Sequence, residues 1–412
     1  MINLENKIFF LFWISNPQTL ILDAASMLVL NFILYACFIY LGFFVFYYLI
    51  FSIAGKLIKP GNIVNYVQMP ARFAVLIPAY KEDGVIVDTV QKNLLQNYPT
   101  DRWDIVVIAD SLNPTTVNKL RSLPIITVEV SFAVSRKAKA INKALSQIGN
   151  YDNIVILDAD NIMGRDFLLK MNEKLQAGAV AVQGHRTAKN RNNALAILDS
   201  ASEEINNHIF RYSQRVIGFS SALIGSGMGF KFDYYKQINT NVEDVWEDRE
   251  LEFRILKSED TIEYLHDAYV FDEKVTDQTV FHNQRSKWMA GQIHYLRKYI
   301  FLNWNKIFTG NIDLLNKLVQ TMSPPRSILL GTLPLMIIIS FLFDARLSYT
   351  YWLALSVCYF LALLLAIPNS MFNRELLKAT LKLPITILMM FLGLFRSVKS
   401  QDISYNTPHG NR

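Results

Sequence analysis

The sequence predicts a Rossmann-like α/β domain, built on a parallel sheet and flanked on both sides by transmembrane helices. The chain has 412 residues, of which 51% are hydrophobic, and its mean hydropathy of +0.20 is high for a water-soluble protein. Long uncharged apolar runs lie near both ends. Between them, short β-branched runs alternate with helical patterns, which is typical of parallel sheets with crossover helices.

The N-terminal apolar run, residues 24–55, predicts a transmembrane helix. It contains no charged residue and exceeds the roughly 20 residues that cross a hydrocarbon core. No small-residue cleavage pattern accompanies it, so we expect a retained helix rather than a secretory signal. Residues 1–23 before it predict an interfacial segment.

The C-terminal part contains several further membrane segments. Residues 327–373 hold two uncharged runs separated only by Asp344-Ala345-Arg346, which predicts a transmembrane hairpin. Residues 383–395 are shorter than a typical span, so a tilted crossing and a re-entrant helix both stay open. Residues 301–326 mix aromatic, aliphatic and basic side chains and predict an interfacial linker helix, and residues 396–412 form a basic tail.

Basic residues beside the apolar runs predict the orientation of the chain. Lys56 and Lys59 follow the first run, and Arg374 and Lys378 follow the hairpin. By the positive-inside bias, the domain at residues 71–300 then faces the cytosol. Because the basic residues cluster beside membrane segments, the net charge of +6 indicates anionic lipids rather than nucleic acid as partners. We therefore expect a multi-pass protein of the plasma or inner membrane.

Five β-branched runs predict the strands of the domain. They are residues 73–78, 104–109, 125–130, 153–157 and 179–183, and helical patterns lie at 86–96, 136–148 and 167–175. Ligands of such sheets bind beyond the carboxyl ends of the strands. The sequence has neither a G-x-G-x-x-G fingerprint nor a P-loop, so we expect a nucleotide to be held in another way.

A helical pattern with regularly spaced charges follows the fifth predicted strand. Glu203, Glu204, His208, Arg211 and Arg215 recur at helical spacing within residues 194–216. We interpret them as a solvated charged face rather than as a site.

Acidic residues follow three of the predicted strands. The first strand ends in Pro78-Ala79-Tyr80-Lys81-Glu82, the second in Asp110, and the fourth in Leu157-Asp158-Ala159-Asp160. Two carboxylates at positions i and i+2 after a buried strand suit Mg²⁺ or Mn²⁺ shared with a diphosphate. The structural alternatives are an Asp-rich turn for this pair and helix capping for the other acids.

Three more motifs follow downstream in a definite order. They are Gly225-Ser226-Gly227-Met228-Gly229, then Trp246-Glu247-Asp248, and then Gln284-Arg285-Ser286-Lys287-Trp288. Together with the acids above, they resemble family-2 glycosyltransferases, in particular the membrane-integrated branch with cellulose, chitin and hyaluronan synthases and ceramide glucosyltransferase. The resemblance covers about residues 71–299 and implies a GT-A type fold.

The resemblance implies a donor site at the carboxyl edge of the sheet. The family's opening P-x-[YF]-x-E and the acid after its second strand contact the nucleoside, which implies such contacts for the matching residues Ala79, Tyr80, Glu82 and Asp110. The G-K-A-x-A-L-N motif matches residues 136–142 with Arg136 in place of Gly, and implies that Lys137 touches the donor. Asp158 and Asp160 match the D-x-D, where the second Asp is the more direct metal ligand.

The remaining motifs imply the reacting groups. Glu247-Asp248 matches the family's E-D segment, in which the Asp is the catalytic base, and Glu247 would raise the pKa of its neighbour. The terminal Q-x-x-R-W is Q-R-S-K-W here, and lysine lacks the bidentate geometry of arginine. The resemblance still assigns Gln284, Arg285 and Trp288 to the donor site, with Arg285 supplying the lost fork.

The implied reaction is an inverting, metal-dependent sugar transfer from a nucleoside diphosphate sugar, with a UDP-sugar as the expected donor. The expected acceptor is a membrane lipid or a growing glycan, and a processive polysaccharide synthase remains an alternative. An inactive membrane-anchored nucleotide-sugar-binding subunit is the alternative from another class. The E-D pair argues against that alternative, since a binding protein needs no base.

Overall fold

The computed structural model describes residues 24–58, 69–301 and 310–383. The chain divides into two compact units. The first comprises residues 1–50 and 324–364, and the second comprises residues 51–323 and 365–412. The predicted interfacial segment 1–23 and basic tail 396–412 lie outside the described residues, as does the run 383–395 apart from its first residue.

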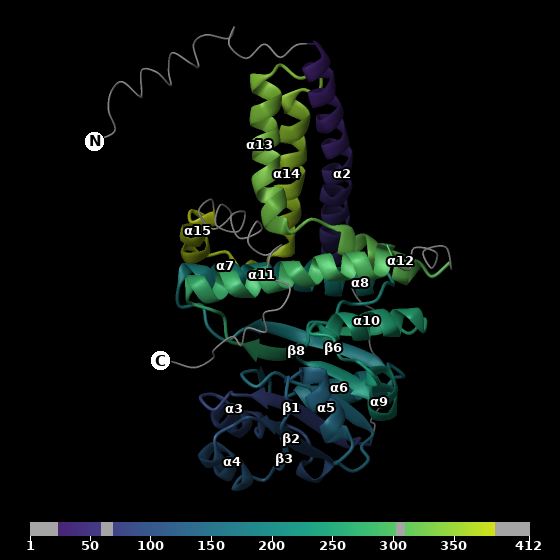
Figure 1. Cartoon of the computed structure of the whole chain (residues 1–412), viewed down its shortest axis with the longest axis vertical. Coiled ribbons are helices and arrows are strands. Elements are labelled where there is room, and N and C mark those ends of the chain that lie inside the picture. Colours follow the sequence, from purple (N-terminus) through teal and green to yellow (C-terminus); the bar gives the residue numbers. More distant parts are fainter. Residues whose placement is uncertain (1–23, 59–68, 302–309, 384–412) are drawn as a thin grey trace, which may run out of the picture. The chain divides into compact units, whose positions relative to one another are not determined.

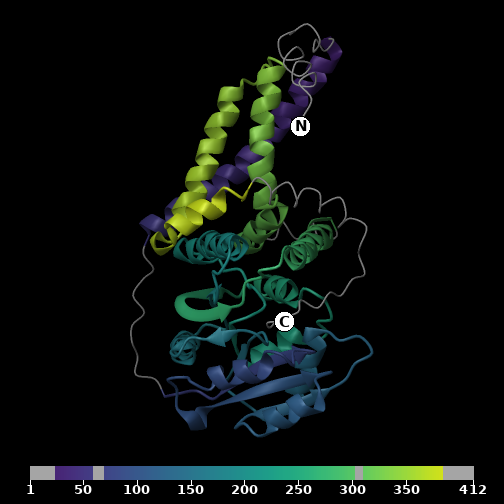
Figure 2. The same ribbon diagram turned by 90° about the vertical axis from the view of Figure 1, so that its left-hand side faces the viewer.

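The first unit consists of long apolar helices (Figure 2). They are α2 (Ala24–Leu57), which continues into the second unit, α13 (Arg326–Leu342) and α14 (Tyr349–Ala366). Phe38 packs edge-to-face on Trp352, with ring centroids 5.1 Å apart, and Tyr48 does so on Tyr359 at 5.8 Å. Between α13 and α14, the Arg346 amide donates to Asn31 Oδ1 at 2.9 Å, which ties the turn to α2.

Two helices in the described part of the chain are long and apolar enough to cross a membrane, namely α2 and α14. A third candidate is α13 together with α12 (Ile312–Met322), if that bent pair is one span. The uncharged runs of the sequence therefore correspond to long apolar helices at the N-terminus and near the C-terminus.

The second unit is built on a mixed sheet of the GT-A type (Figure 1). Its strands are β1 (Phe73–Tyr80), β2 (Trp103–Asp110), β3 (Ile126–Val130), β4 (Asn153–Ile156), β5 (Ile162–Met163), β6 (Ala181–Ala188), β7 (Met228–Lys231) and β8 (Ile262–Asp272). They lie in the order β3-β2-β1-β4-β7-β6-β8-β5. The strands β1 to β4 pair in parallel, and β6 pairs in parallel with β8.

All five predicted strands are present, and the parallel α/β fold class is confirmed. The prediction missed the antiparallel strands β7 and β5 and the long strand β8. The strand β7 begins within the glycine-rich motif that reads as a loop in sequence, since glycine has low strand propensity. Inserted between β4 and β6, it pairs antiparallel with both.

The second unit also contains helices, several of which cover the two faces of the sheet. They are α3 (Ile86–Asn93), η2 (Thr100–Arg102), α4 (Pro114–Arg121), α5 (Lys137–Leu145), α6 (Phe167–Gln176), α7 (Ala194–Asn207), η3 (His208–Tyr212), α8 (Ser213–Val216), α9 (Phe232–Asn239), α10 (Glu247–Lys257), α11 (Gln278–Tyr295), η4 (Leu296–Phe301), α12, η6 (Asn369–Met371) and α15 (Arg374–Thr380). The predicted helices correspond to α3, α5 and α6, each within a few residues of its predicted ends.

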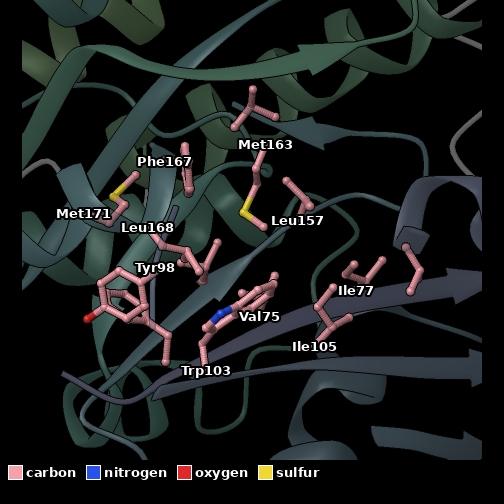
Figure 3. Close-up of a cluster of buried hydrophobic side chains, with 14 of the residues drawn as sticks. Val75, Ile77, Tyr98, Trp103, Ile105, Leu157, Met163, Phe167, Leu168 and Met171 are labelled. Atoms are coloured by element: carbon pink, nitrogen blue, oxygen red, sulfur yellow. The ribbon is translucent and has the colours of Figure 1, made fainter. Parts of the chain in front are cut away.

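The core forms two layers because alternate residues of each strand face opposite sides. Phe73, Val75 and Ile77 of β1 face a cluster with α3 and α6, whereas Ala74 and Leu76 face a cluster with α5, α9 and α10. Figure 3 shows the first cluster, in which side chains of β1, β2 and α6 pack together. Burying such a side chain fully is worth about 1.5–3 kcal/mol, so the sheet is a firm base for the loops at its edge.

The charged helical pattern after β6 is not a solvated face, contrary to the interpretation from sequence. Glu203, Glu204 and Arg211 are all buried, at 7%, 5% and 4% exposure. Strand β6 supplies a partner for each glutamate, His185 for Glu204 and Arg186 for Glu203, and Lys274, just after β8, also pairs with Glu203. Helical spacing identifies residues on one face, but it does not show whether that face meets solvent or buried charges of opposite sign.

Candidate active site

The carboxyl ends of β1 and β2 bring one group of predicted residues together. Parallel pairing sets Ala79 beside Ala109 and Tyr80 beside Asp110. The Lys81 amide donates to the Asp110 carbonyl at 3.1 Å, and Lys81 itself has a left-handed φ of 56°. The Asp110 carboxylate is 2% exposed and accepts from Ser111 Oγ at 3.0 Å.

Glu82 comes directly after this turn and begins the approach to α3. Its carbonyl accepts from the Ile86 amide at 3.1 Å. The residues predicted to contact the nucleoside, Ala79, Tyr80, Glu82 and Asp110, therefore lie along one edge of the sheet, at the ends of adjacent strands.

Lys137 is the centre of the charged group next to this edge. From the start of α5, its Nζ donates to Asp158 Oδ1 at 2.6 Å and to the Gly225 carbonyl at 2.6 Å. Glu247 Oε1 lies 3.2 Å from the same nitrogen. Burial alone would lower the pKa of Lys137, but the carboxylates of Asp158 and Glu247 outweigh it and raise the pKa above its ordinary value. Lys137 is therefore a fixed cation that joins three distant segments.

The two D-x-D carboxylates differ in exposure. The Asp158 side chain is 35% exposed, whereas Asp160 is 5% exposed. Ser226 Oγ accepts from the Asp158 amide at 3.0 Å, so the glycine-rich loop supports the D-x-D turn directly. The backbone of this turn is also tied to β1, because the Leu157 amide donates to the Leu76 carbonyl at 3.0 Å.

The E-D pair occupies the first turn of α10. Glu247 is 7% exposed; burial chiefly, and then the charges of Asp248 and Asp158, raise its pKa to about 7 against the opposing effect of Lys137. The Asp248 side chain is more accessible, and its Oδ1 accepts from the Arg249 amide at 2.9 Å. The accessible carboxylate is thus free to meet a substrate hydroxyl, while the buried one sits against Lys137.

The glycine-rich loop closes on these groups. Gly225 has a φ of +80°, which favours glycine. A Cβ placed there would lie 3.7 Å from Asp248 Oδ2 and 3.8 Å from Lys137 Nζ. The loop backbone is therefore in contact distance of both the candidate base and the central lysine.

Helix α11 carries the Q-R-S-K-W motif, and its members point to different places. Arg285 forms an ion pair with Asp199 of α7, and its guanidinium stacks over Trp288 with 4.5 Å to the ring centroid. Gln284 is partly buried, and its Oε1 accepts no hydrogen bond from the part of the chain that the structure describes, whereas Trp288 is 42% exposed. The described contacts of Arg285 are thus to a helix and aromatic rings.

Lys287 is a functional candidate that the sequence reasoning passed over. Burial lowers the pKa of Lys287, and Glu247, Asp158 and Asp248 act on it in the opposite direction. The charge of Lys287 thus interacts electrostatically with the E-D and D-x-D carboxylates. Its position in Q-R-S-K-W, where the related motif has arginine, was the signal that could have identified it.

Helix α11 also holds the E-D segment in place from the other side. Gly291 lies so close to Trp246 that a Cβ there would come within 2.7 Å of the indole Nε1. The Tyr295 hydroxyl donates to the Trp246 carbonyl at 3.0 Å, and Lys298 pairs with Glu250 at 2.7 Å. The start of α10 is therefore positioned by packing and hydrogen bonds from α11 and the turn that follows it.

Comparisons with known proteins identify the family of the chain. The profile of glycosyl transferase family group 2 matches residues 153–367, which is more than half of the chain. Beta-monoglucosyldiacylglycerol synthase from Nostoc sp. is 23% identical over 242 residues, covering 57% of this chain and 52% of that protein. Probable glycosyltransferase YdaM from Bacillus subtilis is 25% identical over 253 residues, covering 57% of this chain and 58% of that protein.

The chain therefore matches little more than half of the length of these relatives. Among solved structures, the mannosyltransferase PcManGT from Pyrobaculum calidifontis, in complex with GDP-Man and Mn²⁺, superimposes with a TM-score of 0.58. It is 18% identical, and the match covers 90% of this chain and all of that one. At that identity, the likeness establishes the shared fold.

Proposed function

Because the chain belongs to glycosyl transferase family group 2, we propose that it transfers a sugar, with inversion, from a nucleoside diphosphate donor to a membrane-associated acceptor. The observation that carries this proposal is the Lys137 cluster. One lysine joins Asp158 of the D-x-D, Gly225 of the glycine-rich loop and Glu247 beside the candidate base. The proposed donor-binding carboxylate and the neighbour of the proposed base thus contact the same lysine.

The leaving group of the proposed reaction is an anion, and the site provides fixed cations for it. Lys137 stays charged at every physiological pH, because its pKa is raised. Lys287 is a second lysine, whose charged form the same carboxylates favour, although burial lowers its pKa. Preorganised charges of this kind stabilise a developing diphosphate in the transition state more than in the ground state. We propose Lys287, in place of Arg285, as the α11 residue that meets the diphosphate.

Asp248 is the proposed general base. Its carboxylate is more accessible than that of Glu247 and is oriented by the Arg249 amide. It would accept the proton of the acceptor hydroxyl as that oxygen attacks the anomeric carbon from the face opposite the leaving group. A single displacement inverts the anomeric centre and requires no covalent carboxylate intermediate.

The carboxylates also fit a divalent cation shared with the donor. In the described part of the chain, no three His, Cys, Asp or Glu side chains converge into a complete metal cage. Mg²⁺ in nucleotide sites is commonly held by one or two carboxylates together with phosphate oxygens and water, so Asp160 with Asp158 is sufficient. When bound there, the ion would neutralise charge on the diphosphate. Mn²⁺ accompanies GDP-Man in the structurally similar mannosyltransferase.

A lipid is the acceptor class we favour. One relative is named as a synthase of monoglucosyldiacylglycerol, a glycolipid. The described residues contain two or three candidate spans, whereas a processive synthase needs helices enough to enclose a translocation path. We further propose that the second unit faces the cytosol, because Lys56 lies in the last turn of α2, and Arg374 and Lys378 lie in α15, after α14.

The test uses the purified full chain in lipid vesicles with a panel of UDP- and GDP-sugars. We expect nucleoside diphosphate release with one donor, in the presence of Mn²⁺ or Mg²⁺ and a diacylglycerol or ceramide acceptor, and labelled sugar in the organic extract. EDTA and Asp160→Asn should both abolish release, whereas Asp166→Asn, in a nearby exposed acid, should not. Full activity in EDTA would refute the metal-dependent mechanism, and donor binding without any transfer would favour the binding-subunit alternative.

A further inference from the structure

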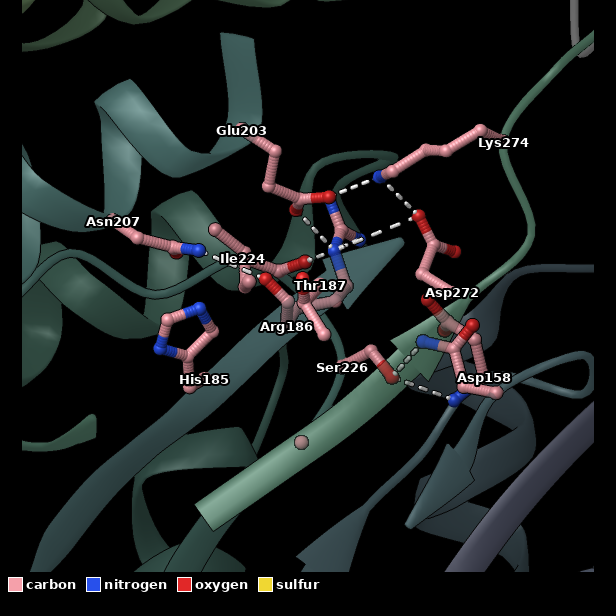
Figure 4. Close-up of polar contacts among 12 residues, drawn as sticks. Asp158, His185, Arg186, Thr187, Glu203, Asn207, Ile224, Ser226, Asp272 and Lys274 are labelled. Carbon is pink, nitrogen blue, oxygen red and sulfur yellow. Dashed lines mark hydrogen bonds and ion pairs between the residues drawn. The ribbon is translucent and has the colours of Figure 1, made fainter. Parts of the chain in front are cut away.

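A second group of charged side chains lies beside the D-x-D turn and is not used by the proposed chemistry (Figure 4). It consists of Arg186 of β6, Glu203 of α7, Asp272 at the end of β8, and Lys274, and we call it the ion network. Arg186 Nε donates to Glu203 Oε1 at 2.6 Å, and Lys274 Nζ donates to Asp272 Oδ2 at 2.7 Å. Lys274 also pairs with Glu203, so the four charges form one connected group.

The ion network is buried and electrically balanced. Its side chains are between 4% and 17% exposed, and two cations meet two carboxylates. Burial would raise the pKa of Glu203, but Arg186 and Lys274 outweigh it and hold the pKa at about 2. Removing four charges from water is costly, and this arrangement is tolerated because each charge has a close partner.

One oxygen of Asp272 is directed away from the cations. Strand β5 pairs antiparallel with β8, with Ile162 opposite Phe271, and continuing this register by one residue brings Asn161 opposite Asp272. The Asn161 amide lies 3.0 Å from Asp272 Oδ1 and 3.0 Å from Asp160 Oδ1. Carboxylate oxygens only accept, so the amide nitrogen must donate to both of them.

The other end of the Asn161 side chain is also fixed. Its oxygen accepts from Ser226 Oγ at 2.7 Å, and Ser226 in turn accepts from the Asp158 amide. The Asn93 side-chain amide donates to the backbone carbonyl of Asn161 at 2.9 Å, and Asn161 is fully buried. The orientation of Asn161 is thus determined on every side, and it bridges the ion network to Asp160.

We propose that Asn161 and Asp272 are positioning residues that fix the metal-binding carboxylate of Asp160, with the ion network holding Asp272 in place. The inference rests on the proposed function, since it requires a divalent ion at Asp160. A donor on Oδ1 sets the rotation of the carboxylate that would hold the ion. Outer partners of metal-binding carboxylates are worth about 10- to 100-fold in metal affinity.

The experiment measures Mn²⁺ binding to the full chain in detergent, by electron paramagnetic resonance of free Mn²⁺ in the presence of UDP or GDP. We expect Asn161→Ala to weaken Mn²⁺ binding by about 10- to 100-fold. Asn172→Ala is the matched control, because Asn172 is equally buried but accepts from the Ala71 amide, remote from the site. It should leave the Mn²⁺ affinity within about twofold of the wild type.

A second variant tests Asp272 without leaving an unpaired buried charge. Asp272→Asn with Lys274→Met removes one charge of each sign and keeps Arg186 paired with Glu203. This variant should fold and should also bind Mn²⁺ more weakly by about tenfold or more. Unchanged Mn²⁺ affinity in folded Asn161→Ala protein overturns the inference and leaves the transfer chemistry standing. A wild type that binds no Mn²⁺ with either nucleotide overturns the metal site itself, and the inference with it.

Discussion

Two buried glutamates of the same unit, Glu247 and Glu203, have pKa values shifted in opposite directions. Burial with nearby like charges raises the pKa of Glu247 to about 7. Burial would also raise the pKa of Glu203, but the cations Arg186 and Lys274 outweigh this effect and hold the pKa at about 2. Both side chains are 7% exposed, so burial alone does not distinguish them. The difference lies in the balance of charge around each one.

This balance separates a structural group from a candidate site. The ion network has as many cations as carboxylates, and its charges satisfy one another. Near Lys137 there are three carboxylates, those of Asp158, Glu247 and Asp248. Lys137 contacts the first two directly, and the carboxylates outnumber this one cation. An unbalanced buried group lowers the stability of the protein by itself, and it is stabilised by a ligand that brings the missing charge. A divalent cation brings such a positive charge.

The largest expected effect follows from removing the proposed base. Asp248→Asn keeps the shape of the side chain but cannot accept the proton, so turnover should fall by about 10²- to 10⁴-fold. Donor binding should change by less than about tenfold, because Lys137, Asp158 and Asp160 remain. Calorimetry of UDP or GDP with Mn²⁺, compared with transfer rates, separates the two effects. Asp233→Asn, an exposed acid of α9, is the control and should change neither. If binding collapses together with turnover, Asp248 belongs to the donor site.

The next effect comes from unbalancing the ion network. Lys274→Met leaves Glu203 and Asp272 with Arg186 as their remaining cation, and an uncompensated buried charge costs about 3–5 kcal/mol of unfolding free energy. Urea unfolding of the full chain in detergent measures this loss. Adding Asp272→Asn restores the balance and should recover a large part of it. A Lys274→Met protein as stable as the wild type would show that the network contributes nothing to folding.

The fold was predictable because its signals are local. Buried parallel strands produce continuous apolar runs, and the runs 73–78, 104–109 and 153–157 all became strands of the sheet. Strand β7 was not predicted, because it depends on pairing with both β4 and β6 rather than on its own four residues.

The motifs of the candidate site could be predicted from the sequence, but the contacts among its side chains could not. The order of D-x-D, E-D and Q-R-S-K-W made Asp158, Asp248 and α11 candidates, but the sequence did not show that Arg285 pairs with Asp199 or that the carboxylates act on the charge of Lys287. The ion network has no sequence signature, since its members come from three separated segments and meet only through the pairing of β6 with β8.

A smaller effect concerns the pH dependence of stability. The folded protein holds the proton of Glu247 up to about pH 7, whereas an ordinary glutamate loses it near 4.5. The stability that this proton contributes is present below about pH 4.5 and is lost as the pH rises through 7. The unfolding temperature of Glu247→Gln should therefore rise relative to the wild type between pH 5 and pH 8, by about 2–4 °C for each kcal/mol.

Glu203→Gln provides the contrast for this measurement. Its pKa is lowered, so the stability from its charge is lost only as the pH falls from about 4.5 towards 2. Between pH 5 and pH 8, its difference from the wild type should be constant. If the difference in unfolding temperature between Glu247→Gln and the wild type is also constant, then Glu247 is already ionised at pH 5. In that case, nearby groups offset the effect of burial on its pKa.

The smallest expected effect tests whether the stability that the ion network contributes comes from ion pairing itself or from the burial of the pairs. Arg121 and Glu129 also form an ion pair, but their side chains are 60% and 52% exposed. Water screens such a pair and already solvates both charges, so its coupling energy should be about 0–1 kcal/mol. A double-mutant cycle with Arg121→Ala and Glu129→Ala measures this energy by urea unfolding, and high salt should reduce it further. A coupling as large as the loss expected for Lys274→Met would contradict the comparison, because ion pairing would then stabilise the protein regardless of exposure.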